Sequence, residues 1–355
     1  MTTNASFEGV LTTPGAKEKP GDKVRLRGHS KIDYTERLLP VDPKEADHKV
    51  VRVYERIEFQ KVIGDRTDET TLRPAVKRVV VLKQGAKKAP FSPDGPLLWG
   101  EIELLSRETI IPALAGLLPD KPVKPGDTWT ASAAALAELT DLEKVDAGSL
   151  EVKLERVIEN GPRRIADLTL AARLTGINED GPTRQKVTGK LQVDLKGGFI
   201  SLLTLDGEQV LLDETGAEAG VVKIRFELFR EPSAGHAGIK DEALKGLELT
   251  PTAENTALLY ESDETGVRFV HPRNWRVVRT AGRQITLDVT GGAGVLVTLD
   301  AAGAGPTAAQ FLQETIKALA ERNGKLLGQA GPEKLAAGVE RFTLEAEEGP
   351  DKDKV

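Results

Sequence analysis

The chain has 355 residues, of which 39% are hydrophobic and 29% charged, with a formal net charge of −6 and no cysteine. This composition can build packed cores, and the length favours two domains because single cores stop growing at about 250–300 residues. The acidic balance argues against general nucleic-acid binding, and the lack of thiols excludes disulfides and cysteine-bound metals. No apolar run approaches the ~20 residues of a membrane-spanning helix.

The beginning of the chain is expected to be a flexible lead-in over residues 1–22, which are polar and lack the apolar core of a signal peptide. Residues 23–27 follow as a short, half-exposed strand. A longer alternation comes next, with apolar residues of one parity at Val51, Val53, Ile57, Phe59 and Ile63. Arg52 falls on the other parity, so the pattern predicts a long antiparallel strand with one wet face.

The main helical candidate of this part covers residues 97–118, and Pro112 is expected to split it. After Trp129, short strands and tight turns dominate as far as residue 230. The turns are expected at 160–162, 197–198 and 213–220. Short connections between successive strands predict a meander of antiparallel neighbours, and hence a curved, mostly β domain over residues 23–230.

The last third of the chain is expected to form a separate unit. Residues 231–255 hold few periodic apolar residues and are predicted to be a linker between domains, with one short helix. Residues 256–355 contain five short strand-like segments. They are followed by one amphipathic helix that begins near Thr307 and stops at Asn323-Gly324. This combination predicts an α+β domain, in which Trp275 is expected to anchor the core.

The segment 261–345 resembles the PsbP-like α/β/α sandwich group. The resemblance depends on the run VRFVHPRNWRVV, on two strands separated by Gly291-Gly292, and on the helix near Thr307. Such domains place a Pro before a buried Trp in a hairpin, as Pro272 and Trp275 do here. They usually carry a further strand after the position of Leu344, so the resemblance implies an incomplete domain. It also implies a non-enzymatic assembly factor or extracytoplasmic accessory protein.

Residues 23–230 are similar to exported bacterial domains of unknown function whose curved sheet is like the lipoprotein-carrier (LolA/LppX-like) half-barrel. The similarity depends on LLPDKPVKPGDTW and on the meander GKLQVDLKGGFISLLTLDGEQVL. It implies a concave sheet face that holds a lipid-like ligand, in an extracytoplasmic compartment. No specific motif carries ligand-contacting residues over to this chain.

Motifs for catalysis or for metals are absent from the sequence. The four histidines, His29, His48, His236 and His271, lack metal-ligand spacing, and no phosphate-binding or nucleophile motif occurs. Two acidic groups are expected to be solvated turns rather than calcium sites: Asp65, Asp68 and Glu69, and Asp213, Glu214 and Glu218.

One basic cluster is unusual because it lies within sixteen residues that contain no acid. Its members are Arg268, Arg273, Arg276, Arg279 and Arg283. Their guanidinium groups could share a sheet face and dock an acidic protein partner. The alternative is an ordinary solvated face whose acids come from neighbouring strands.

We therefore expect an α+β, mostly β fold, with a half-barrel-like antiparallel sheet, one or two helices and a smaller C-terminal α/β sandwich. The favoured hypothesis is a non-enzymatic extracytoplasmic protein that binds an apolar or lipid-like ligand in the concave sheet and needs no cofactor. A scaffold or assembly factor that docks through the C-terminal domain is the first alternative. A hydrolase whose site forms only in the fold is the second.

Overall fold

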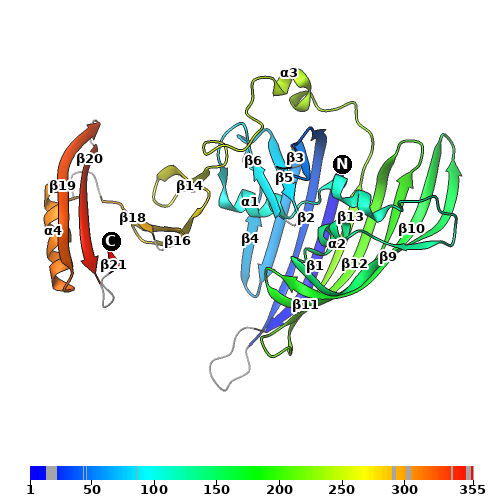
Figure 1. Ribbon diagram of the computed structural model, residues 1–355, viewed down its shortest axis with the longest axis horizontal. Helices are drawn as coiled ribbons and strands as arrows, with labels where there is room; N and C mark the ends of the chain where they lie inside the picture. Colours follow the sequence, from blue (N-terminus) through cyan, green and yellow to red (C-terminus); the bar gives the residue numbers. More distant parts are fainter. Residues whose placement is uncertain are drawn as a thin grey trace. The chain divides into compact units, whose positions relative to one another are not determined.

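The computed structural model describes residues 1–12, 22–42, 44, 46–85, 87–289, 293–300, 305–336, 339–348 and 353–354. The chain divides into two compact units, Met1–Arg273 and Asn274–Val355. Each unit is described by itself below (Figure 1). Within the described ranges, every helix is too short and too polar to cross a bilayer.

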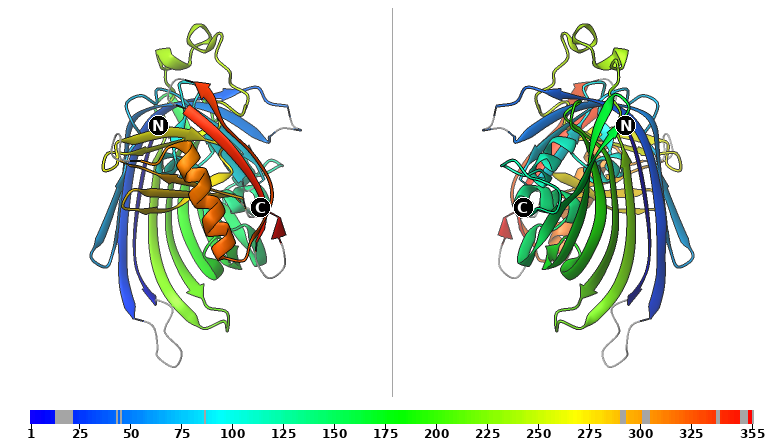
Figure 2. Two further views of the ribbon diagram at one scale, coloured as in Figure 1. Left: turned by 90° about the vertical axis from the view of Figure 1, so that its left-hand side faces the viewer. Right: turned by 90° about the vertical axis from the view of Figure 1, so that its right-hand side faces the viewer.

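A twelve-stranded antiparallel sheet forms the first unit, as the alternation predicts. Its order is β6-β5-β3-β2-β1-β13-β12-β11-β10-β9-β8, and β4 pairs with β3. The strands are β1 (Thr2–Thr12), β2 (Lys23–Leu39), β3 (His48–Ile63), β4 (Arg66–Thr70), β5 (Val79–Gln84), β6 (Lys87–Phe91), β8 (Thr128–Thr130), β9 (Lys144–Asn160), β10 (Arg163–Asn178), β11 (Gly181–Asp194), β12 (Phe199–Leu212) and β13 (Glu218–Phe229). Figure 2 shows this sheet curving around helices that lie against one face, here called the inward face.

The expected flexible lead-in is wrong for residues 2–12, which form β1 in the middle of the sheet. β1 pairs with β2 on one side and with β13 on the other, antiparallel in both cases. Its alternate residues Thr3, Ala5 and Phe7 are shielded, whereas Ser6 and Glu8 are exposed. Pairing on both edges satisfies the backbone of this polar segment, which therefore needs few large apolar side chains. Residues 13–21 lie outside the described part.

A layer of short helices covers one end of the inward face. It consists of α1 (Trp99–Ser106), the 3₁₀ helix η1 (Ile111–Leu117) and α2 (Ala133–Thr140). Pro112 stands in the first turn of η1, so the expected split of the helical segment is confirmed. Leu114, Leu117 and Leu136 from this layer share one core with Leu191 and Leu203 of the sheet.

The expected linker 231–255 is instead packed on the outward face of the first unit. It contains the 3₁₀ helix η2 (Ala237–Ile239) and α3 (Asp241–Leu244). Ile239 and Leu244 are buried against Val51, Val80 and Phe91. The side chain of Arg37 in β2 donates to the carbonyl of Ile239 at 2.9 Å.

Two further strands also belong to this unit. They are β14 (Leu258–Ser262) and β15 (Val267–His271), and β14 lies parallel to the short β7 (Leu97–Leu98). The division between the units therefore falls after Arg273, eighteen residues beyond the expected linker's end at 255. The buried side chains of Ile239 and Leu244 and the pairing of β14 with β7 attach these segments to the first unit. The boundary therefore lies further along the chain than expected.

The second unit contains two small antiparallel sheets and one long helix. The first sheet is β16 (Trp275–Ala281), β17 (Gln284–Val289) and β18 (Gly294–Thr298). The helix α4 (Ala308–Glu321) precedes the second sheet, which is β19 (Lys325–Ala336), β20 (Val339–Glu348) and β21 (Asp353–Lys354). Gly291-Gly292, the expected hairpin turn, lies outside the described residues.

Helix α4 has the termini that its sequence predicts. The Thr307 hydroxyl accepts a hydrogen bond from the Gln310 amide, and the Gln310 side-chain oxygen accepts one from the Thr307 amide, as in a capping box. Asn323 adopts a left-handed φ of 60° at the C-terminal stop. The expected core anchor Trp275 is half-buried in β16. The PsbP-like identity of this unit stays a prediction.

We predict that Leu191→Ala lowers the free energy of unfolding of the first unit by about 2–5 kcal/mol, because it opens a cavity under a fully buried side chain. Leu195→Ala is the matched control, since Leu195 is 45% exposed. It should change stability by less than about 0.5 kcal/mol. Urea titration monitored by circular dichroism measures both, and equal losses would contradict the assigned core.

Candidate functional site

The inward face carries apolar side chains beyond the end that the helices cover. Strand register sets Leu26 of β2 beside Gly9 of β1, and Phe7 of β1 beside Ile224 of β13. Under the helical layer, inward residues such as Ile32 and Leu228 are fully buried. Further along the same strands Leu26, Phe7 and Phe59 are only partly buried and Ile224 is exposed, although Val222 is buried. This less covered part, called the open apolar patch, comprises Leu26, Phe59, Phe7, Ile224 and Phe226, and its members Phe59 and Phe226 also pack against the covered cores.

Two aromatic rings form the most closely packed part of the open apolar patch. The ring centroids of Phe7 and Phe59 are 6.4 Å apart, from strands that both neighbour β2. Gly28 of β2 lies opposite Phe7 in register, and a Cβ there would stand 2.3 Å from Cζ of Phe7. Gly28 is thus required for the Phe7 ring to lie across β2. On the other side of Phe7, Ile224 is 38% exposed.

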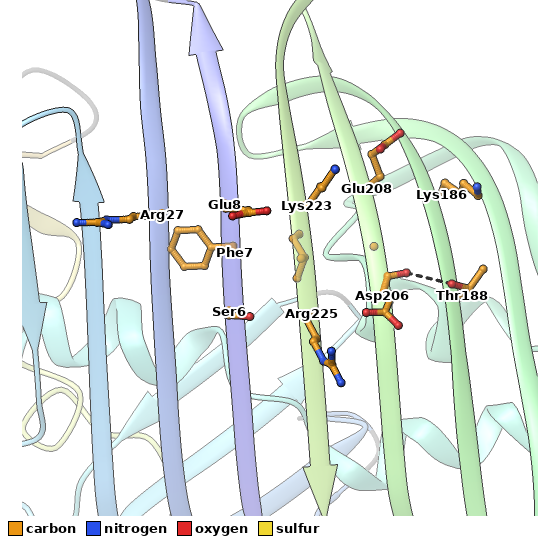
Figure 3. A pocket seen from close by; sticks show the side chains of 12 residues that line it. Ser6, Phe7, Glu8, Arg27, Lys186, Thr188, Asp206, Glu208, Lys223 and Arg225 are labelled. Carbon is orange, nitrogen blue, oxygen red and sulfur yellow. Dashed lines mark hydrogen bonds between the residues drawn. The ribbon is translucent and has the colours of Figure 1, made fainter.

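The opposite, outward face of the same strands holds a charged depression of about 500 Å³ (Figure 3). One row of its lining alternates in sign across five strands, in the order Arg27, Glu8, Lys223, Glu208, Lys186. Opposite charges on directly paired residues stabilise an antiparallel sheet. Four cationic and three acidic side chains line the depression, so it offers a ligand little net charge.

A second depression of about 710 Å³ adjoins β3 where β3 lacks a partner between β4 and β5. Its cations are engaged in structural contacts. Arg73 forms a bidentate ion pair with the buried Glu101, and Arg78 pairs with Asp94. His236 accepts a hydrogen bond from the Gly238 amide through Nδ1 at 3.0 Å. Its two arginines beside Glu101 and Asp94 and its histidine are therefore already paired within the protein, whereas Lys77 at its rim is exposed.

A buried polar cluster lies on the inward face between the helical layer and the sheet. Arg52 is fully buried, and its Nε donates to Oε2 of Glu36 at 2.9 Å. Its Nη2 donates to the carbonyl of Thr109 at 2.7 Å, and Nη1 stands 3.8 Å from Oε2 of Glu108. The guanidinium lies 4.5 Å from the centre of the Tyr34 ring. Desolvation raises the pKa of Glu108 to about 7.

A β-bulge at Glu55 brings Arg52 into this cluster. The register of β2 and β3 shifts after Asp33, so Tyr54 and Arg52 face inward, as do Ile57 and Phe59 despite their opposite parity. The expectation that Val51 and Val53 share a face with Ile57, while Arg52 is wet, is therefore wrong. An extra residue in one strand reverses every later side chain of that strand.

A second buried ionic group ties the helices to the sheet edge. The Glu138 carboxylate of α2 accepts a hydrogen bond from the Ile110 amide at 2.7 Å. It lies 2.7 Å from Nζ of Lys83 in β5 and 3.0 Å from Nζ of Lys88 in β6. Lys88 also donates to the carbonyl of Glu108 at 2.9 Å. The Arg52 cluster and the Glu138 ionic group are both enclosed by the fold, which favours a structural role for their charges.

The predicted arginine cluster is divided between the two units. Arg268, in β15 of the first unit, is exposed and lies 3.9 Å from Glu261. Arg273 donates to the carbonyl of Pro90 at 2.6 Å, and its partial burial lowers its pKa. Arg273 is therefore occupied in holding the end of the first unit to β6.

The remaining three arginines lie in the second unit. Arg276 and Arg279 face the same side of β16, because a bulge between them compensates their odd spacing. Asp288 of β17 lies directly opposite Arg276 in register, as expected for a solvated face with acids from a neighbouring strand. Arg283 lies in the turn before β17 and is exposed. Docking of an acidic partner through these residues stays a prediction.

The histidines and the acidic clusters do not form a metal site among the described residues. His271 is buried at the end of β15, and its ring lies 6.0 Å from that of Phe269. Asp213 accepts hydrogen bonds from the amides of Thr215 and Ala217, so its role as a turn residue is confirmed. Hydrogen bonds lower the pKa of Asp213, first of all the bond from the Thr215 hydroxyl and then those from the backbone amides.

Phe7, the central residue of the open apolar patch, lies in the segment 1–22 for which the sequence predicts a flexible lead-in, and this prediction does not point to it. The alternation of Ala5, Phe7 and Gly9 with Ser6 and Glu8 was the available indication. The other members of the patch were recognised as strand residues, but their lack of cover depends on where the helices end.

Comparison with known proteins identifies no family. No protein-family model and no curated protein matches the chain. Among solved structures, a conserved hypothetical protein from Mycobacterium tuberculosis with a double hotdog fold aligns over 64% of this chain and 74% of its own. The identity is 12% and the TM-score 0.13, so this likeness carries no argument about fold or function.

We predict that Glu108→Gln removes a pH dependence from stability. The folded-state pKa of about 7 lies above the ordinary 4.5, so between these values the folded chain keeps a proton that the unfolded chain has lost. Rising pH therefore removes stability across this window, by up to about 3 kcal/mol.

The test is urea titration of both proteins from acid to neutral pH. The wild type should lose stability relative to Glu108→Gln as the pH rises through the window. Glu103→Gln, at an exposed position of α1, is the control and should track the wild type. A constant difference between wild type and Glu108→Gln would show that the carboxyl titrates normally.

Proposed function

We propose that this protein is a non-enzymatic binding protein that holds an apolar ligand against the open apolar patch of its curved sheet. One observation carries the proposal. On the inward face, Phe7, Ile224 and Leu26 continue the core of the protein beyond the helices that cover it. Binding surfaces for small molecules are mostly apolar, concave and largely preformed. A contiguous exposed apolar area on a soluble domain typically marks such a surface.

The rigidity of the patch supports the proposal. Each strand that contributes to it pairs along both edges at the patch, and β4 provides the outer partner of β3 from Phe59 to Ile63. The patch therefore does not need to be ordered when a ligand arrives, which reduces the entropic cost of binding. The proposal includes an extracytoplasmic location, which a chain without cysteine favours.

A second candidate is a protein-binding scaffold that docks through the second unit. The observation in its favour is that Arg276 and Arg279 share one exposed face of β16. The hydrolase alternative has less support. His271 is buried beside Phe269, and neither depression on the first unit includes it.

We predict that Ile224→Gln weakens binding of an uncharged apolar dye such as Nile red about tenfold, because a buried amide without a partner costs about 1–3 kcal/mol. Val10→Gln is the matched control. Val10 is 40% exposed, close to the 38% of Ile224, but it faces outward from the neighbouring strand. Dye fluorescence titration measures both, alongside native mass spectrometry of ligand that copurifies. Equal effects of the two substitutions would refute the patch as the binding surface.

A further inference from the structure

Beyond the helical layer, Lys61 is the one charged residue among the described inward positions of β3, β2, β1, β13 and β12. Inward positions have odd numbers over residues 57–63 of β3, in β1 and in β12. They have even numbers over residues 24–32 of β2 and 220–228 of β13. The outward positions of the same strands carry charges throughout, for example Arg27, Glu8 and Lys223. A charge on the inward side is therefore the exception that calls for a role.

The surroundings of Lys61 are those of the patch itself. It follows Phe59 by two residues on β3 and lies opposite Gly28 on β2, over which the Phe7 ring packs. Lys61 is half-buried, as are Phe59 and Phe7. A lysine at such a place lays its methylene stem along apolar surface and keeps its ammonium at the edge.

The acid that stands nearest to Lys61 in register is on β4, at an inward position close to Arg66. Asp68 of β4 is the residue opposite Lys61 in register, but its Oδ1 accepts from Nε of Arg66 at 2.9 Å. Within the described part of the chain, Lys61 forms no ion pair or hydrogen bond. The apolar side chains of the patch thus end at Lys61, beside the Arg66–Asp68 ion pair of β4.

We propose that the ligand is an anionic amphiphile, a single acyl or alkyl chain whose head group pairs with Lys61. This inference rests on the proposed function and adds the class of ligand. An apolar chain would cover Phe7, Ile224 and Leu26, and its carboxylate or phosphate would meet the ammonium. Because apolar side chains of the patch lie along one side of the pair, its attraction is stronger than that of an ion pair in open water. Lys61 therefore determines head-group specificity, and the patch supplies the general affinity.

The experiment compares ligands that differ only in their head groups. Laurate, dodecyl phosphate and dodecanol displace Nile red from the full chain, from Lys61→Met and from Lys61→Arg. We expect the wild type to bind the two anions at least about tenfold more tightly than the alcohol. Lys61→Met should abolish that preference by weakening the anions alone, and Lys61→Arg should retain it. The two anionic arms distinguish a fatty-acid head from a phosphate head.

Lys31→Met, at an exposed outward position of β2, is the matched control and should keep the preference of the wild type. Thermal unfolding of each variant establishes that it folds. If anions and alcohol bind equally, or if Lys61→Met keeps the preference, the anionic class is overturned while the proposed function stands. If neither anions nor alcohol displace the dye, the proposed function fails as well.

Discussion

The arrangement of both faces depends on the register of β1 between its two neighbours. β1 pairs with β2 and β13 over almost its whole length, which places Phe7 on the apolar side and Glu8 between Arg27 and Lys223 on the other. A slip of one residue would bury Glu8 among aromatic rings and expose Phe7 to water. The alternating charges on the outward face therefore stabilise the same register that creates the apolar face.

Much of this architecture could be predicted from sequence, but the pairing of β1 with β13 and the packing of residues 231–255 could not. The hairpins from β9 to β13 have short connections and clear alternation, and Pro112 indicates the break between helices. β1 escaped because its segment has few large apolar residues and its partner β13 begins more than two hundred residues later. The packing of residues 231–255 could not be predicted for a related reason. Ile239 and Leu244 are too few to form a periodic pattern, yet both are buried.

The bulge at Glu55 explains why the candidate site was only partly predictable. Alternation along β3 continues in sequence from Val51 to Ile63, and a regular strand would place Arg52 in solvent. One extra residue brings Arg52 beneath the helices, where it meets Glu36 and the carbonyl of Thr109. A bulge also brings Arg276 and Arg279 to one face of β16, against their odd spacing. Sequence parity predicts strands well, but it predicts faces only between bulges.

The charged side chains of the inward face are arranged differently at the end that the helices cover and at the open end. Beneath the helices the charges are paired: Arg52 pairs with Glu36, and Glu138 pairs with Lys83 and Lys88. Arg52 and Glu138 also bind a carbonyl and an amide of the connecting segments, which attaches the helical layer to the sheet. Beyond that layer the inward charges are Lys61 and the Arg66–Asp68 ion pair of β4, and among the described residues Lys61 has no internal partner. A buried charge without a partner is costly, so an unpaired lysine is stable only where it reaches water or an anion. The open end of the sheet therefore provides what the covered end lacks, an apolar surface with a single unmet charge at its edge.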